Sequence, residues 1–316
     1  MAASLPPQKY TRGHTVGLVL APFSGGQPRG GVEHGPNQLL ENGLAKQLRA
    51  LGWTVEGDGP DAMPDFESLR PAKELVHGIL KNPLFVSRVT QKIHELVKKT
   101  CAEGKVALTL GGDHSIGMGT VSGSAAVHDN LGVIWVDAHA DINTADTTES
   151  GNLHGCPMSF VMGIGPKVEA FSWLKPCLRP SRIVYIGLRD VDQGEKRILR
   201  ENGIKAFSMH EVDKYGIGRV MELAIAHLGA DCPIHLSFDV DALDPSVAPA
   251  TGTPVRGGLS FREGHYICES IFETGRLVSM DIMEVNPQLG ADHASLVQTI
   301  QVGCSLVRSA LGETLL

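Results

Sequence analysis

Three short clusters of acidic residues and histidines, each at the end of an apolar run, constrain the fold of this chain most. They occupy residues 111–114, 137–141 and 239–241 and read GGDH, DAHAD and DVD. Along an extended strand, residues two apart point to the same face, so the polar residues of each cluster can converge on one point. Burying several ionised carboxylates together is unfavourable unless other charges offset them. The pattern therefore predicts a site for two divalent cations.

Short apolar runs alternate along the chain with longer amphipathic stretches. Continuous runs such as residues 132–136 are typical of strands buried on both faces of a parallel sheet. The predicted strands are Val16–Leu20, Trp53–Val55, Val106–Leu110, Val133–Val136, Ile183–Ile186, Ala206–Ser208, Ile234–Phe238 and Leu277–Met280. The predicted helices are Pro36–Leu51, Pro83–Cys101, Gly194–Asn202, Gly218–Leu228 and Arg262–Thr274. We expect a three-layer α/β/α fold around a mostly parallel, eight-stranded sheet.

We expect a single domain over residues 1–316, because no repeat, low-complexity tract or linker divides the chain. Residues 1–14 precede the first predicted strand and are a candidate for a disordered tail. The segment richest in glycine and proline, Ser24–Gly35, lacks a phosphate-binding pattern and is interpreted as a mobile loop at the active site or the surface.

The composition excludes several partners. A net charge of −7 with scattered lysines and arginines argues against nucleic acid. No apolar stretch approaches the ~18 residues of a membrane span, and the N-terminus has no apolar signal core. The six cysteines form no C-x-x-C pair, so we expect free thiols and a cytoplasmic location.

Four of the polar sites fall at equivalent places in the predicted sheet. Asp137, Asp239 and Glu284 directly follow apolar runs, and His114 follows another run through two glycines. Ligands of open α/β sheets bind beyond the carboxyl ends of the strands. An acid after a strand is often only a helix cap or turn former. Cap roles do not explain so many acids on one edge, so the combination indicates a metal centre on that edge and a two-metal hydrolase.

The chain resembles the ureohydrolases and, among them, the arginases of the fungal cytosol. The resemblance runs from about Thr15 to the C-terminus and rests on GGDHS at 111–115, DAHAD at 137–141, SGNLHG at 150–155, SFDVDALDP at 237–245 and MEVNP at 283–287. It implies hydrolysis of L-arginine to L-ornithine and urea by a hydroxide that bridges two metal ions.

The resemblance also implies the metals and their ligands. Two Mn²⁺ ions are expected, and Asp137 and Asp239 would bridge them. The ligand set is His114, Asp137, His139, Asp141, Asp239 and Asp241. A set of carboxylates with one imidazole per ion independently favours a hard cation such as Mn²⁺, although Zn²⁺, Co²⁺ or Fe²⁺ could also bind.

Further roles follow from the resemblance alone. Asp141 is expected to carry a proton to the leaving amine, His154 to shuttle protons to solvent, and Glu284 to pair with the guanidinium group. The expected substrate-binding residues are Asn143, Thr148, Ser150, Asn152, Asp192, Glu195 and Thr253. Two positions differ from animal arginases, Asp146 and Gln193, and neither change removes a functional group.

Arg262 and Glu263 match a pair that joins subunits in trimeric arginases, so a homotrimer is expected.

Cys156 follows the His154–Gly155 step, but no Cys-His-Asn arrangement surrounds it. We interpret it as a small packing residue.

Three other functions remain open from the sequence. An agmatinase would share the metal ligands, but would not need the residues expected to bind an α-carboxylate and an α-amino group. A deacetylase with one zinc ion would not need the doubled set of carboxylates. A catalytically inactive binding protein would not need every ligand and proton-transfer position to be intact, as they are here.

Overall fold

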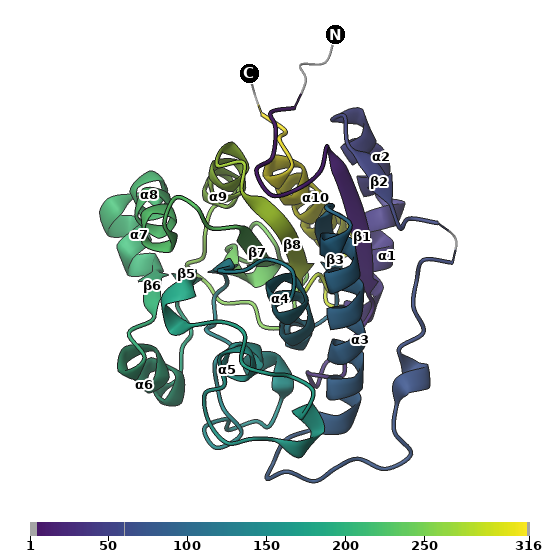
Figure 1. The fold of residues 1–316 in the computed structure, drawn as a ribbon, viewed down its shortest axis with the longest axis vertical. Coiled ribbons are helices and arrows are strands. Elements are labelled where there is room, and N and C mark those ends of the chain that lie inside the picture. The colour runs from purple at the N-terminus through teal and green to yellow at the C-terminus, as the bar shows by residue number, and fades with distance from the viewer. Residues whose placement is uncertain (1–4, 60, 315–316) are drawn as a thin grey trace.

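The computed structural model describes residues 5–59 and 61–314, and within them eight strands form one sheet (Figure 1). The strand order is β2-β1-β3-β8-β7-β4-β5-β6, and every recorded pairing is parallel. The strands are β1 Thr15–Ala21, β2 Thr54–Glu56, β3 Val106–Gly111, β4 Gly132–Val136, β5 Ile183–Leu188, β6 Lys205–Ser208, β7 Ile234–Asp239 and β8 Leu277–Met283. The predicted α/β class and parallel sheet are confirmed.

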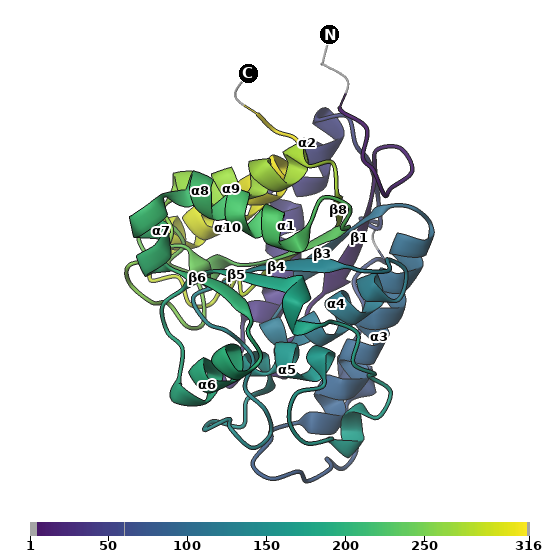
Figure 2. The same cartoon turned by 60° about the vertical axis from the view of Figure 1, so that its left-hand side comes forward.

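Helices cover both faces of this sheet, as Figure 2 shows. One face carries α1 Gly35–Glu41, α2 Leu44–Ala50, α7 Met209–Tyr215, α8 Ile217–Leu228, α9 Phe261–Glu273 and α10 His293–Ala310. The other carries α3 Pro83–Ala102, α4 Gly117–Ala125, α5 Pro157–Met162 and α6 Gln193–Glu201. Side chains alternate along β1, so that Leu18 joins the core of the first face and Val19 that of the second.

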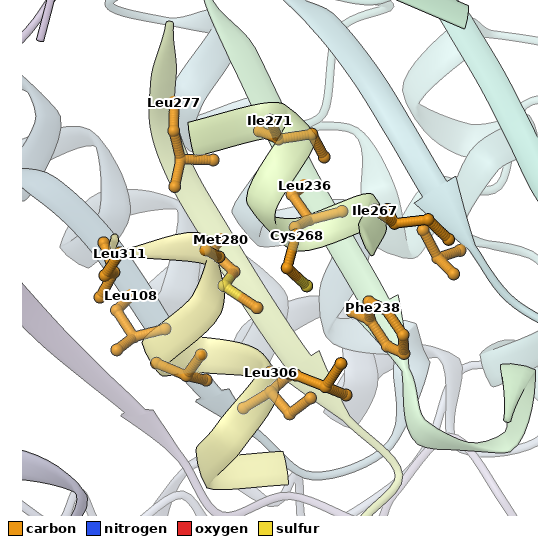
Figure 3. Close-up of a cluster of buried hydrophobic side chains, with 14 of the residues drawn as sticks. Leu108, Leu236, Phe238, Ile267, Cys268, Ile271, Leu277, Met280, Leu306 and Leu311 are labelled. Carbon is orange, nitrogen blue, oxygen red and sulfur yellow. The ribbon is translucent and has the colours of Figure 1, made fainter. Parts of the chain in front are cut away.

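The core beneath α9 and α10 shows how the central strands are held in place (Figure 3). Ile267 and Ile271 of α9 and Leu306 of α10 pack with Leu236 and Met280, which come from neighbouring strands. All five side chains are buried. This packing fixes β7 and β8 side by side, and the carboxyl ends of these two strands carry site residues.

One helix prediction was wrong, and some helices were not predicted at all. The segment Pro36–Leu51 is not one helix, because the chain breaks at Asn42 and Gly43, where Gly43 adopts a left-handed φ of 83°. Helix α4 was missed because nearly all of its residues are buried, which leaves no amphipathic pattern. Helix α10 was also missed, although Asp292 supplies an N-cap by accepting a hydrogen bond from the Ser295 N–H.

The N-terminal segment runs along the amino-terminal edge of the sheet. The N–H groups of Lys9 and Arg12 donate to the carbonyls of Gly275 and Gly104, and Leu5 packs against the core. The predicted tail of residues 1–14 thus has contacts from Leu5 onward, and residues 1–4 lie outside the described part. In that described part, no helix has the length and apolarity needed to cross a membrane.

The glycine turn after β3 leaves no space for a side chain at Gly112. A Cβ atom at Gly112 would overlap the carbonyl oxygen of Phe23, which accepts the Asp113 N–H at 2.8 Å. Gly112→Ala must therefore displace backbone, and overpacking of this kind costs about 1–3 kcal/mol. We expect that loss in the free energy of unfolding, measured in urea. Gly59→Ala, at an exposed position with open space, should change it by less than about 0.5 kcal/mol. Equal effects would contradict the steric argument.

Candidate metal centre

Four neighbouring strands of the sheet bring predicted site residues together, three of them metal ligands and the fourth Glu284. Strands β3, β8, β7 and β4 are adjacent, and their carboxyl ends lead into His114, Glu284, Asp239 and Asp137. Their loops are tied to each other, since the Glu284 N–H donates to the Gly112 carbonyl at 3.1 Å. Residues more than 150 positions apart in the chain thus meet at one edge of the sheet.

The first ligand group surrounds Nδ1 of the buried His114. This atom lies 3.1 Å from Asp137 Oδ2, 3.1 Å from Asp239 Oδ2 and 3.4 Å from Asp141 Oδ2. The imidazole stacks on Trp135 with ring centroids 4.0 Å apart and planes 11° from parallel. The ring cannot swing away without breaking this stacking, so Nδ1 stays aimed at the carboxylates.

The second ligand group surrounds Nδ1 of His139. It lies 3.3 Å from Asp137 Oδ1 and 3.2 Å from Asp241 Oδ2. Asp137 therefore faces one histidine with each of its carboxylate oxygens. Two sets of candidate ligand atoms share it, the first with His114 and Asp141 and the second with His139 and Asp241. A shared carboxylate is the arrangement that holds two cations close together.

Local backbone geometry aims these acids. Asp137 Oδ1 accepts the N–H of His139 at 2.7 Å, and Asp239 Oδ1 accepts that of Asp241, also at 2.7 Å. In each case the strand ends in a turn that places the next ligand two residues on. Asp141 and Glu284 have φ angles of 49° and 63°, a left-handed conformation unusual for these residues. Unusual backbone of this kind concentrates at functional sites, where the surrounding fold maintains it.

The electrostatics of the centre favour cations. Burial, together with neighbouring carboxylates, raises the pKa of Asp141 and of Asp239 well above the usual range. Burial opposes the protonation of His139, but Asp241 and Asp137 outweigh it, so its pKa is also raised. In the absence of a cation, protons offset the crowded negative charge.

An acidic cleft of about 250 Å³ opens onto this centre. Its carboxylates are those of Asp141, Asp190, Asp192, Glu195, Asp239, Asp241 and Glu284. Among the described residues that line it, none is lysine or arginine. The cleft is therefore suited to cationic ligands.

Within the lining of the cleft, Asn143, Asp192 and Glu195 form a hydrogen-bonded set. Asn143 Nδ2 donates to Asp192 Oδ2 at 2.6 Å, and the Asp192 and Glu195 side chains cap helix α6 reciprocally. Glu195 also accepts the N–H of Ile142 at 3.2 Å. Burial, reinforced by the charge of Asp192, raises the pKa of Glu195 to about 7. Thr253 lines the cleft as well, and its hydroxyl donates to Asp241 Oδ2 at 2.8 Å.

Three predicted substrate residues do not line the cleft. Thr148 and Asn152 are buried, and Ser150 is exposed on the same loop. The Thr148 hydroxyl accepts the Gly151 N–H at 3.1 Å, and the Ser150 hydroxyl accepts the Asn152 N–H at 3.2 Å. The amide oxygen of Asn152 accepts from Lys81 Nζ at 3.1 Å. In this structure these three side chains shape the loop beside the cleft.

Glu284 and His154 stand together on the cleft wall. Glu284 Oε1 accepts the His114 N–H at 2.9 Å and lies 3.8 Å from His154 Nδ1. Burial lowers the pKa of His154, but Glu284 outweighs that effect, so the pKa is raised above its ordinary value. The imidazole remains about one-fifth exposed. It thus connects a buried carboxylate with the cleft opening.

Sequence reasoning missed three residues of the site. Trp135 donates its indole N–H to Asp137 Oδ2 at 3.0 Å, and Gln27 donates its amide to Glu284 Oε2 at 2.9 Å. Asp190 lines the cleft. Trp135 carried a signal, because it lies two residues before Asp137 on the same face of the strand. For Gln27 the sequence offered no signal except its place in the glycine-rich segment Ser24–Gly35. Gln27 is buried there and contacts Glu284.

Cys156 has the structural role expected of it. Its thiol is buried and lies 3.7 Å from the Asn152 carbonyl, and burial raises its pKa well above the usual range. A thiol that does not ionise is a poor nucleophile.

The residues present fit hard divalent cations. The two ligand groups contain carboxylate oxygens and imidazole nitrogens and no thiolate, a set that suits Mn²⁺. The buried carboxylates also need a compensating positive charge. An α/β/α fold with such a candidate centre at its central strand ends is the arrangement expected of a metal-dependent hydrolase.

Comparison with known proteins identifies the family. Residues 14–312 match the Arginase family. The chain is 59% identical to the arginase of Glaciozyma antarctica over 309 residues, covering 96% of this chain and 89% of that protein. It is 55% identical to the arginase of Neurospora crassa over 327 residues, covering 100% and 91%. The solved structure of arginase from Bacillus caldovelox has a TM-score of 0.87 at 39% identity, covering 96% of this chain and 100% of that chain. The chain belongs to the arginase family, and the predicted resemblance is confirmed.

Proton competition predicts that cation binding depends on pH. The pKa values of Asp141, Asp239 and His139 are raised without a cation, so these side chains hold protons. A cation that binds must displace these protons, and the displacement becomes less favourable as the pH falls. We expect the Kd for Mn²⁺ to rise by about tenfold or more per pH unit of acidification below neutrality. Isothermal titration calorimetry in buffers of different ionisation enthalpy measures both this slope and the protons released. A Kd that is constant between pH 6 and 8 would contradict the expectation.

Proposed function

We propose that this protein is an arginase that hydrolyses L-arginine to L-ornithine and urea at a centre that holds two Mn²⁺ ions. The observation that carries the proposal is the cleft, which joins two ligand groups sharing Asp137 to the acidic set formed by Asp192 and Glu195. L-Arginine is cationic at both ends, with a guanidinium group and an α-ammonium group. A cleft lined by carboxylates beside the ligand groups and also by Asp192 and Glu195 can pair with both cationic groups.

His114, Asp137, Asp141 and Asp239 would hold one cation, and Asp137, His139, Asp239 and Asp241 the other. Asp239 is assigned to both cations because its Oδ2 lies 3.1 Å from His114 Nδ1 and the next ligand in the chain, Asp241, belongs to the other group. When bound, two such cations supply a water acidified to react near neutral pH and positive charge at the reacting centre.

The chain's own residues position the substrate and move protons. Glu284, held rigid by Gln27 and by the His114 N–H, pairs with the guanidinium group and fixes its orientation. Asp141 takes the proton released by the attacking water and delivers it to the leaving amine. His154 exchanges protons between Glu284's side of the cleft and solvent, a role suited to a partly exposed imidazole.

Specificity comes from cleft residues that are not metal ligands. Asp192 and Glu195 meet the α-ammonium group, and Asn143 and Thr253 contribute neutral hydrogen-bonding groups. Thr148, Ser150 and Asn152 would meet the α-carboxylate from the adjoining loop, and to do so their side chains must turn from their present loop contacts toward the cleft. The α-carboxylate is the feature that separates L-arginine from agmatine.

The assembly we propose is a cytoplasmic homotrimer joined through Arg262 and Glu263. Arg262 is exposed at the start of α9, which leaves it free to reach a second subunit. Glu263 accepts the N–H of Ser260 at 2.8 Å as part of the cap of this helix, so its interface role would use its remaining carboxylate oxygen.

Urea release from L-arginine and agmatine, measured side by side with Mn²⁺ and with EDTA, tests the function. We expect turnover of L-arginine only, and only with the metal. Asn143→Ala should raise the KM for L-arginine by roughly 10- to 100-fold, because it removes a hydrogen bond to a charged group of the substrate. Agmatine turnover in the wild type would retain the metal centre but overturn the proposed substrate.

His154→Asn tests the proton shuttle. The variant lacks a titratable ring, so we expect kcat to fall on the order of 100-fold while two Mn²⁺ ions still bind. Steady-state urea release and metal analysis of the same sample measure both quantities. His227→Asn, at an exposed position on α8, serves as the matched control and should leave kcat unchanged. Full activity in His154→Asn would refute the shuttle.

A further inference from the structure

A chain of buried polar side chains lies behind the metal centre, on the side of His114 that faces away from the carboxylates. His114 Nε2 is 2.9 Å from Ser237 Oγ, and Ser237 Oγ is 3.2 Å from Asp281 Oδ2. All three residues are at most 1% exposed. Ser237 and Asp281 sit opposite each other on neighbouring strands β7 and β8, so the sheet itself fixes their separation.

Asp281 collects three contacts on one oxygen. Besides Ser237, its Oδ2 lies 2.6 Å from Thr120 Oγ1 and 3.0 Å from His235 Nε2. An ionised carboxylate oxygen can only accept, so all three neighbours must donate to it. A proton on Oδ2 would satisfy one of these contacts and oppose the other two. Three convergent donors therefore assign Oδ2 as the acceptor of all three hydrogen bonds, whereas Oδ1 of Asp281 is buried and has no hydrogen-bond partner among the described residues.

This arrangement fixes the direction of every hydrogen bond up to the metal centre. If Ser237 gives its only hydrogen to Asp281, its oxygen can make a hydrogen bond to His114 only by accepting one. Nε2 of His114 must then carry the hydrogen. In the neutral imidazole this leaves the lone pair on Nδ1, the atom that faces Asp137 and Asp239 at 3.1 Å. Only that tautomer can ligate a cation among these carboxylates.

We propose that Ser237 and Asp281 are positioning residues that set the tautomer and the orientation of His114 for cation binding. The inference rests on the proposed two-cation function and deepens it. Partners of this kind behind a ligating histidine typically account for 10- to 100-fold in metal affinity. Here the partner reaches the histidine through a serine hydroxyl.

The second histidine has no comparable support in the described part of the chain. His139 Nε2 lies 3.8 Å from Asp190 Oδ2, and the Asp190 side chain is 67% exposed. A solvated, distant carboxylate constrains an imidazole weakly. The effect of the buried pair is therefore confined to the cation held by His114, and this asymmetry makes it measurable.

The test is stepwise Mn²⁺ binding by calorimetry to the wild type, Ser237→Ala and Thr120→Val. Ser237→Ala removes the link to His114 and should weaken one of the two Mn²⁺ sites by 10- to 100-fold, leaving the other unchanged. Thr120→Val is the matched control, because it removes a hydrogen bond to the same Asp281 oxygen but does not contact His114. Both Mn²⁺ sites should keep their wild-type affinity in this control.

Thermal unfolding in EDTA separates positioning from damage to the core. We expect both variants to lose similar stability without metal, whereas only Ser237→Ala loses Mn²⁺ affinity. Ser237→Thr restores a hydroxyl and should recover the lost affinity. If Thr120→Val folds poorly, this rescue remains the deciding comparison.

The outcomes distinguish a failure of the positioning role from a failure of the proposed function. Wild-type affinity at both sites in Ser237→Ala, or an equal loss in Thr120→Val, would overturn the positioning role and leave the proposed function standing. A wild-type protein that binds no Mn²⁺ would overturn both.

Discussion

Mutual repulsion among four buried carboxylates is the constraint on which the rest of the structure depends. Asp137, Asp141, Asp239 and Asp241 are at most 6% exposed and lie around two histidines. Such a group persists only where donors and positive charge surround it. The backbone N–H groups at the strand ends, the two imidazoles and the indole of Trp135 supply part of this compensation, and the proposed cations would supply the remainder.

The architecture follows from placing these charges together. The carboxyl ends of four adjacent parallel strands offer loops that converge without crossing, and helices on both faces exclude water from the strands below. The same loops carry the left-handed conformations of Asp141 and Glu284. Tertiary packing holds these conformations, and the side chains are thereby fixed before any ligand arrives.

The negative charge of the candidate metal centre continues along the cleft, which is lined by further carboxylates. A lining without lysine or arginine among its described residues attracts cations of every kind, so charge alone does not select the substrate. Under the proposed function, selection would come from neutral donors such as Asn143, which is oriented by Asp192. Behind the centre, the buried Asp281 applies the same principle, because an oriented acceptor decides where a hydrogen lies on His114.

The sequence by itself determined the ligand types, their two-residue spacing, the α/β class and the family, because periodicity and motif spacing are local properties. Tertiary structure alone decided the strand order that brings β8 between β3 and β7, and with it the meetings of Glu284 with His114 and of Asp281 with Ser237. It also decided that Thr148, Ser150 and Asn152 stand beside the cleft. Strand neighbours are chosen by packing between segments distant in the chain, and the local pattern of one sequence does not record that choice.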